Sequence, residues 1–297
     1  MLVSVLAVVV LGRATPAGAA PATTASAAAV TATAGTSAAA GSVERAVDYL
    51  QARQRPDGGF AEPGRQSDPA LTAWAVLGLA AAGRPPSDAA AYLIGKPYPS
   101  ATDLALRILA LDALGREVSG LARQLEGLRR SNGQIGPLVN STIWGIIALR
   151  AAGRTVPAAT VSWLRRAQRA NGGWAWGTGQ KPDADDTAAA VQALRAAGIP
   201  AGAKAVRRGL AFLRARQNAD GGFESDTGRG SNAQTTAWAI QGFLAAGRSP
   251  GAGAYRYLES LQRADGSFRL SRRYVTTPVW VTAQVTAALA RRHFPLR

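Results

Sequence analysis

The sequence predicts an all-α fold, an α6/α6 toroid in which six helical hairpins form two concentric rings. The first observation is a glycine turn that occurs five times, each time a short distance before an apolar helix. The second is a common register, because the spacing from a threonine to a closing glycine is 11 residues in four of these helices. The third is that these helices are apolar on nearly every side, which is typical of helices buried all round. An internal repeat of this kind determines the architecture before any single residue does.

Each repeat consists of an amphipathic helix, a glycine turn and an apolar helix. The turns lie at residues 57–60, 132–134, 171–174, 220–223 and 265–268. The apolar helices begin with Thr-x-Trp or a variant of it, at residues 72–74, 142–144, 187–189, 236–238 and 278–280. Four of them close with Ala-Ala-Gly, which indicates a helix ended by a C′ glycine. Before the first turn, apolar residues of 43–50 recur at i, i+3, i+4 and i+7. This pattern predicts an outer helix with one buried face.

A sixth copy lacks the glycine turn but has the length of an inner helix, at residues 104–115. Six hairpins then occupy residues 44–294, at about 42 residues each, a period typical of two-helix repeats. Such hairpins can stack as an open solenoid or close into a ring. The apolar helices have no polar face for an open concave surface, so we expect closure. Trp74, Trp144, Trp238 and Trp280 are then expected at matching positions of the inner ring.

The N-terminal segment has the pattern of an export signal. Residues 2–11 form an apolar run too short to span a bilayer, and Ala17-Gly18-Ala19 fits an A-x-A cleavage site. We therefore predict a signal peptide over 1–19, with an apolar tail as the alternative because no basic residue precedes the run. An Ala/Thr/Ser-rich stretch over 20–42 is predicted to be a disordered linker. The toroid domain is expected over 43–297, in a secreted protein without a transmembrane segment in its mature chain.

Composition excludes several classes of function. The chain has no cysteine and one histidine, His293, so neither disulfides nor a conventional zinc site are expected, and no metal or cofactor is predicted. The net charge of +16 fits an anionic ligand or an anionic cell-envelope surface. A solvated basic face is the simpler alternative. No nucleic-acid-binding motif accompanies the charge, so nucleic acid is not an expected partner.

The strongest candidate site is the acidic run Asp183, Asp185 and Asp186 at the start of an apolar helix. Carboxylates that are close together and poorly solvated raise one another's pKa, so one of them keeps a proton near neutral pH. Such a group can protonate an alkene, and indole faces can stabilise the resulting carbocation. The expected ligand-binding residues are these three aspartates together with Trp74, Trp144, Trp176, Trp238 and Trp280.

Comparison among the repeats indicates different roles for the three aspartates. Asp183 is aligned with Asp68 and Asn232, which predicts a helix N-cap. Asp185 and Asp186 have no acidic counterpart in the other repeats. They fit first-turn acids stabilised by the helix dipole, a ligand-binding pair, or a proton donor.

The glutamine, glycine and aromatic residues of 54–60, 168–174, 217–223 and 262–268 resemble the repeats of the prenyltransferase and squalene–hopene cyclase superfamily. The segment 172–188, with Asp183-Ala184-Asp185-Asp186-Thr187, is similar to the Asp-x-Asp-Asp-Thr motif of class II terpene cyclases. That resemblance implies the α/α toroid and Asp185 as proton donor. The zinc prenyltransferase branch needs Cys and His ligands that this chain lacks. The helical domain of the secreted cobalamin carriers is also similar, which implies a corrinoid as another ligand.

These observations predict a secreted toroid that binds an apolar or amphipathic ligand, isoprenoid-like or corrinoid, or a cell-surface partner. Binding is expected at the barrel mouth and without catalysis. The alternative is a class II terpene cyclase of the squalene–hopene kind in which Asp185, with Asp186, is catalytic.

Overall fold

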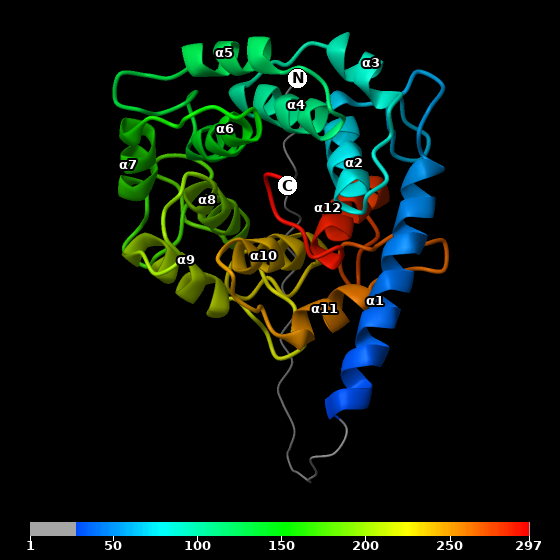
Figure 1. The fold of residues 1–297 in the computed structure, drawn as a ribbon. Coiled ribbons are helices and arrows are strands. Elements are labelled where there is room, and N and C mark those ends of the chain that lie inside the picture. Colours follow the sequence, from blue (N-terminus) through cyan, green and yellow to red (C-terminus); the bar gives the residue numbers. More distant parts are fainter. Residues whose placement is uncertain (1–27, 297) are drawn as a thin grey trace.

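The computed structural model describes residues 28–296, with side chains from residue 40 onward, and contains two concentric rings of helices (Figure 1). The inner ring consists of α2 (Pro69–Ala81), α4 (Ala101–Ala113), α6 (Val139–Ala151), α8 (Ala184–Ala196), α10 (Ala233–Ala245) and α12 (Pro278–Leu289). The outer ring consists of α1 (Ala28–Gln51), α3 (Ala89–Ile94), α5 (Ser119–Gly127), α7 (Ala158–Arg166), α9 (Lys204–Arg214) and α11 (Ala252–Glu259). No β-strand occurs among the described residues, so the predicted α6/α6 toroid is confirmed.

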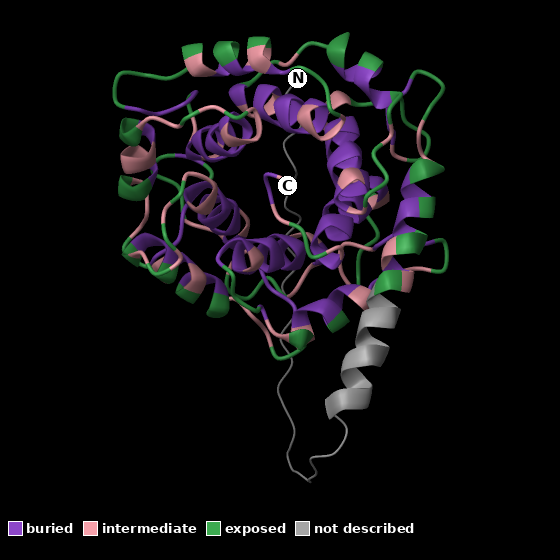
Figure 2. Ribbon diagram, viewed as in Figure 1, coloured by how far each residue is buried: buried purple, intermediate pink, exposed green. Residues whose placement is uncertain are grey.

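The inner helices are buried along almost their whole length, whereas the outer helices alternate buried and exposed residues (Figure 2). α4, the copy without a glycine turn, takes its predicted place between α2 and α6. Because each inner helix packs on two inner neighbours and an outer helix, it has no solvent-exposed face for charged residues. The composition seen in the sequence follows from this packing.

The glycine turns place each inner helix against the next outer helix. Gly133 adopts a φ of +96°, and a Cβ atom there would lie 2.5 Å from the carbonyl oxygen of Ala159 at the start of α7. The Asn132 side chain accepts a hydrogen bond from the backbone N–H of Gln134 and so closes the turn. Both the left-handed backbone and the close approach require glycine at this position.

The threonine of each repeat joins its inner helix to the preceding turn. Thr72 Oγ1 accepts a hydrogen bond of 2.8 Å from the backbone N–H of Phe60. The same bond forms in four other repeats, at Ile135–Thr142, Trp174–Thr187, Phe223–Thr236 and Phe268–Thr282. Thr282 is therefore the register residue of α12.

The predicted alignment of Trp280 with the other three indoles is consequently wrong. Trp280 precedes Thr282, whereas Trp74 follows Thr72 by two residues, and Gln284 holds the matching position in α12. The reason is that the last loop is long and Pro278 begins the helix early, at a position where proline costs no hydrogen bond.

The ring closes through the carboxylate of Glu62. In three repeats the first N–H groups of an inner helix donate to a backbone carbonyl of the following repeat, as Ala184 N does to Ser225 O at 3.0 Å. The last inner helix, α12, meets the first, α2, and there Glu62 accepts from Val279 N at 3.0 Å and Trp280 N at 2.9 Å. The Glu62 side chain takes the place of the backbone carbonyl that the other repeats supply, and it accepts hydrogen bonds from two N–H groups at the start of α12.

We expect Glu62→Ala to lower the free energy of unfolding by roughly 2 kcal/mol, because two helix N–H groups lose a charged acceptor in a half-buried place. Glu62→Gln keeps one acceptor oxygen and should lose less. Urea unfolding measures both, with the exposed Glu44→Ala on α1 as the control. Equal stability of Glu62→Ala and the control would contradict a role for Glu62 in closing the ring.

The N-terminal boundary differs from the prediction. The signal-peptide range 1–19 lies outside the described residues. The segment 20–42 is predicted to be a disordered linker. Residues 20–27 of it also lie outside the described residues, and α1 begins at Ala28 within the rest. Alanine has the highest helix propensity, so the helix of 43–51 continues backward through the Ala-rich stretch. Ser42 is buried, and its hydroxyl donates to Gln262 Oε1 at 2.8 Å, which makes residue 42 part of the domain.

Candidate functional site

Asp183, Asp185 and Asp186 gather at the N-terminal end of α8, at the barrel mouth formed by the starts of the inner helices. Asp183 is the N-cap, and its side chain accepts a hydrogen bond of 2.8 Å from the backbone N–H of Asp186. Asp68 caps α2 in the same way, and Asn232 caps α10. The capping role that the repeat comparison predicts for Asp183 is thus present.

Asp186 points sideways within the inner ring. It is buried, and its Oδ1 accepts a hydrogen bond of 2.7 Å from Asn140 Nδ2 in α6. The side-chain oxygen of Asn140, Oδ1, in turn accepts a hydrogen bond of 3.1 Å from the hydroxyl of Thr102 in α4. This chain of polar contacts links three neighbouring inner helices, so Asp186 joins helix ends. Asn140 was not among the predicted site residues, although a polar residue at the start of an apolar helix could have indicated it.

Asp185 faces the axis of the barrel. It lies four residues before Ala189, which is aligned with Trp74, and seven before Gln192, so the three share one helix face. Its carboxyl group faces Thr235 of α10, which lowers its pKa, and its Oδ1 atom is buried without a hydrogen-bond partner among the described residues. Part of the residue is accessible to solvent although protein atoms crowd the carboxyl group. Asp185 is therefore the member of the trio that can reach a ligand.

Burial raises the pKa of all three carboxyl groups. It raises the pKa of Asp185 to about 7, and the charge of Asp183 adds to the effect. Desolvation also raises the pKa of Asp183, and the charge of Asp186 adds to this effect. Desolvation raises the pKa of Asp186 as well, although the hydrogen bond from Asn140 opposes the rise. Near neutral pH the trio therefore holds protons that isolated aspartates would have lost.

Replacing the N-cap residue Asp183 tests whether its role is only to stabilise α8 or also to bind a ligand. We expect Asp183→Ala to lower the free energy of unfolding by about 1 kcal/mol, because one N–H group of the α8 end loses its acceptor. Asp68→Ala removes the equivalent cap of α2, which has no acid in its first turn, and is the matched control. Thermal unfolding compares the two variants. A loss of ligand affinity in Asp183→Ala alone would assign Asp183 to the binding site as well.

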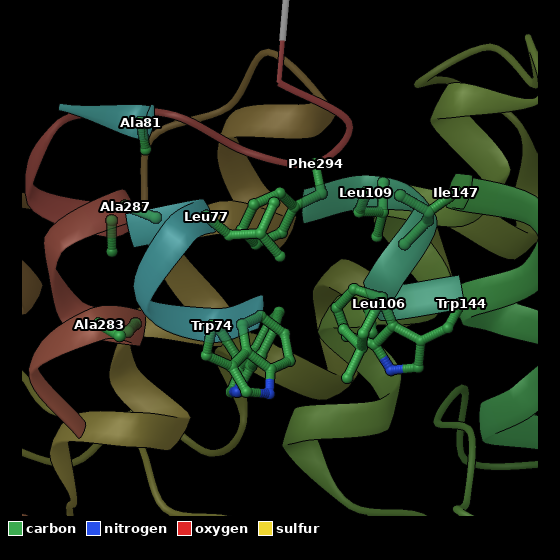
Figure 3. Packing of buried hydrophobic residues seen from close by; sticks show 14 of the residues in the cluster. Trp74, Leu77, Ala81, Leu106, Leu109, Trp144, Ile147, Ala283, Ala287 and Phe294 are labelled. Atoms are coloured by element: carbon green, nitrogen blue, oxygen red, sulfur yellow. The ribbon is translucent and has the colours of Figure 1, made fainter. Parts of the chain in front are cut away.

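The predicted tryptophans fill the axis of the ring. The ring centroids of Trp74, Trp144 and Trp238 lie 5.2 to 5.3 Å apart in edge-to-face contacts, and each side chain is only 4% exposed. Trp280 lies 6.2 Å from Trp74. The Phe294 ring lies 6.1 Å from that of Trp74 in an edge-to-face contact, and Figure 3 shows it beyond Trp74 and Trp144 along the axis. We call Trp74, Trp144 and Trp238 the tryptophan layer. It closes the barrel at the level of three indoles that the sequence predicts to bind a ligand.

Trp176 lies apart from that layer, in the loop that leads into α8, and is 44% exposed. Tyr274 and Val275, in the loop that leads into α12, are also exposed large apolar residues. These loops surround the starts of the inner helices, as shown by the bond from Asn140 N to Trp176 O. Exposed large apolar side chains therefore lie on two of the loops that lead into inner helices, at the end of the ring where α8 begins with Asp185.

In the described part of the chain no three histidine or acidic side chains are arranged to hold a metal ion. None of the described helices is long and apolar enough to cross a membrane. His293 lies beside the barrel axis next to Phe294, and burial lowers its pKa.

Two family models match the sequence. The squalene–hopene cyclase C-terminal domain matches residues 156–297, and the prenyltransferase α/α toroid domain matches residues 21–97. No curated protein sequence matches the chain. The two matched ranges do not overlap, and together they cover most of the sequence.

Solved structures share the fold at low sequence identity. A protein from Actinoplanes has a TM-score of 0.67 and 21% identity, over 85% of this chain and 99% of its own. A variant of the type II terpene cyclase MstE from Scytonema, in complex with its substrate geranylgeranyl dihydroxybenzoate, has a TM-score of 0.67 and 17% identity, over 87% and 98%. A wild-type glycosidase has a TM-score of 0.61 and 13% identity, over 86% and 96%.

At such identities the likeness establishes the fold alone, since one toroid serves a cyclase and a glycosidase. The family matches are more specific, because both describe the α/α repeats that the glycine turns and register threonines build here. The chain therefore resembles the prenyltransferase and squalene–hopene cyclase α/α toroid proteins over both matched ranges.

Proposed function

We propose that the protein binds an amphipathic, isoprenoid-like ligand at the barrel mouth without transforming it. The observation that carries the proposal is the position of Asp185, an axis-facing carboxyl group with a buried, unpartnered oxygen above the closed tryptophan layer. A buried polar atom without a partner is costly, and a ligand hydroxyl would satisfy it. The filled axis supports binding at the mouth, because a long polyene has no chamber in which to fold at the level of the indoles.

The rim supplies the apolar part of the site. Trp176 and Tyr274 expose large rings on two loops at the mouth, and exposed apolar groups near a polar group are typical of ligand sites. An isoprenoid alcohol offers the matching chemistry, with a hydroxyl group for Asp185 and a hydrocarbon chain for the rim. A corrinoid or a cell-surface component are the other occupants that the sequence suggests.

Geranylgeraniol is a suitable probe, with binding followed by tryptophan fluorescence. We expect saturable binding that weakens about tenfold in Asp185→Asn, because one buried hydrogen bond to a carboxyl group changes. Trp176→Ala should also weaken it, whereas the exposed control Asp88→Asn should not. An unchanged affinity in both Asp185→Asn and Trp176→Ala would contradict binding at the mouth. The visible spectrum of the protein purified from its native source tests for a bound corrinoid.

A second candidate function is proton-initiated cyclisation of an isoprenoid. It is favoured by the pKa of Asp185, about 7, which keeps a proton on an axis-facing carboxyl group near neutral pH. In this reaction Asp185 would transfer its proton to a carbon–carbon double bond, and the carbocation would close a ring and lose a proton to a base or add water. The proteins it resembles in fold include the cyclase MstE.

Mass analysis of geranylgeraniol after incubation separates the two functions. Binding with full recovery of the probe supports the binding role. A cyclic product that disappears in Asp185→Asn and persists in Asp88→Asn supports the cyclase. If the probe neither binds nor reacts, neither function holds for isoprenoid alcohols.

We also propose that the protein is exported and contacts an anionic envelope surface. A cleft of about 400 Å³ between α7 and α9 is lined by Arg165, Arg166, Lys204 and Arg208, which supports the second part. Fractionation of the native culture tests the first part.

A further inference from the structure

The axis of the ring on the far side of the tryptophan layer is occupied by residues that follow α12. The chain leaves α12 at Leu289, turns at the exposed Arg291 and enters the ring, where Phe294 and Pro295 are buried (Figure 1). The Phe294 ring lies 6.1 to 6.3 Å from the centroids of Trp74, Trp144 and Trp238. Phe294 is therefore centred on the tryptophan layer. We call residues 293–296 the axial segment.

The walls around Phe294 are of two kinds. An apolar wall is formed by Leu77 of α2, Leu109 of α4 and Ile147 of α6 (Figure 3). Each of them follows the register position of its helix by five residues. The same position holds Gln192 in α8, Gln241 in α10 and the small Ala287 in α12. Both glutamines are 0% exposed. The side chains on one side of the axis are therefore purely hydrocarbon, and those on the other side include two primary amides.

The amide wall has unused hydrogen-bonding groups. Gln192 Oε1 accepts a bond of 2.8 Å from the backbone N–H of Phe294, but Gln192 Nε2 has no partner among the described residues. Both amide atoms of Gln241 also lack one there. A buried amide without partners is costly and calls for a physical reason. The adjacent helices α8 and α10 both carry such an amide at a position where α2 and α4 have leucine, and a leucine there would have no polar group to satisfy.

We propose that this part of the axis is a second binding site, for a compact aromatic ligand that bears an amide group, and that the axial segment occupies it as an internal substitute. Phe294 already makes both contacts of such a ligand, with its ring on the indoles and its N–H on Gln192. A free carboxamide has a donor and an acceptor, which match the Gln241 Oε1 and Gln192 Nε2 atoms left over. Neutral amides, unlike charged groups, fit a fully buried wall.

This site is separate from the mouth. Gln192 follows Asp185 by seven residues on α8, which corresponds to about 10 Å along a helix. The tryptophan layer lies between them, at the level of Ala189. Loss of ligand binding at one site therefore need not accompany loss at the other.

The test uses full-length protein and the probe N-acetyl-phenylalanine amide. The wild-type chain should not bind it, because the tethered axial segment has a very high effective concentration. Phe294→Ser, Pro295→Gly and Leu296→Ser together should release the segment. That variant should then bind the probe saturably, seen as a change in tryptophan fluorescence and a rise in Tm. Adding Gln192→Leu should weaken binding about fivefold or more, as expected for one lost hydrogen bond. The exposed Gln51→Leu is the matched control.

Two results would overturn the proposal. In the first, the released variant folds but does not bind the probe. In the second, it binds toluene as tightly as the amide probe and Gln192→Leu changes neither affinity, which would make the site an apolar void filled by packing. If the released variant does not fold, Phe294→Ala opens a benzyl-sized space in an otherwise intact chain. Benzamide, which carries the amide group, should then raise its Tm more than toluene does, and an equal rise or no rise would likewise refute the site.

Discussion

Raising the pH from about 4 to about 8 should destabilise the protein, because Asp183, Asp185 and Asp186 have pKa values raised above those of unfolded aspartate, near 4. Between these limits the folded state binds more protons than the unfolded state, so stability falls as pH rises. The stabilising contribution is complete below pH 4 and is lost as the pH passes through the raised pKa values. Acids with lowered pKa, such as Asp57, act mainly below this range.

The expected loss is of the order of several kcal/mol. One pKa unit corresponds to about 1.4 kcal/mol, and the pKa of Asp185, about 7, alone lies roughly three units above its usual value. Partial contact of this side chain with water reduces the effect, so we expect roughly 3 kcal/mol for the trio.

Urea unfolding at pH 5 and pH 8 measures the difference. Asp185→Asn with Asp186→Asn should flatten the pH dependence and make the protein as stable as wild type or more stable at pH 8. Asparagine keeps the oxygen that accepts from Asn140, so this contact survives. The exposed Asp48→Asn on α1 is the control. An unfolded double variant would instead make the two acids necessary partners of the fold, and an unchanged pH slope would contradict their raised pKa.

Trp74→Ala should lower the free energy of unfolding by about 3 to 5 kcal/mol, as large-to-small changes at buried aromatic residues do. Trp74 contacts Trp144, Trp238, Trp280 and Phe294, so its removal leaves a cavity in the middle of the inner ring. Edge-to-face aromatic contacts add to the loss of buried area.

Trp176→Ala is the matched control, because that indole is 44% exposed, and we expect a change of less than about 0.5 kcal/mol. Thermal unfolding gives the stabilities, and near-ultraviolet circular dichroism reports the loss of indole contacts. A small effect of Trp74→Ala would mean that the axis can rearrange around the missing ring. The tryptophan layer would then be a flexible wall, which is the arrangement a cyclase cavity needs.

The sequence alone was sufficient to predict the toroid, the hairpin repeats and the helix cap at Asp183. These features depend on local chemistry. A left-handed glycine such as Gly133, a threonine hydroxyl such as that of Thr187 and an apolar helix face each follow from a few neighbouring residues. Even the hidden repeat over 104–115 was recognisable, because its length and composition are those of an inner helix.

Only the tertiary structure could decide what these helices enclose. Asp185 and Asp186 are adjacent in sequence, yet one faces the axis and the other faces Asn140, because neighbouring helical residues point about 100° apart. The sequence shows four similar tryptophans, but only the indoles of Trp74, Trp144 and Trp238 share one level of the axis, because Trp280 precedes the register residue Thr282. Phe294 lies more than a hundred residues from Gln192 in sequence and reaches it only because the ring closes at Glu62. Such contacts join distant segments, and side-chain packing rather than local pattern determines them.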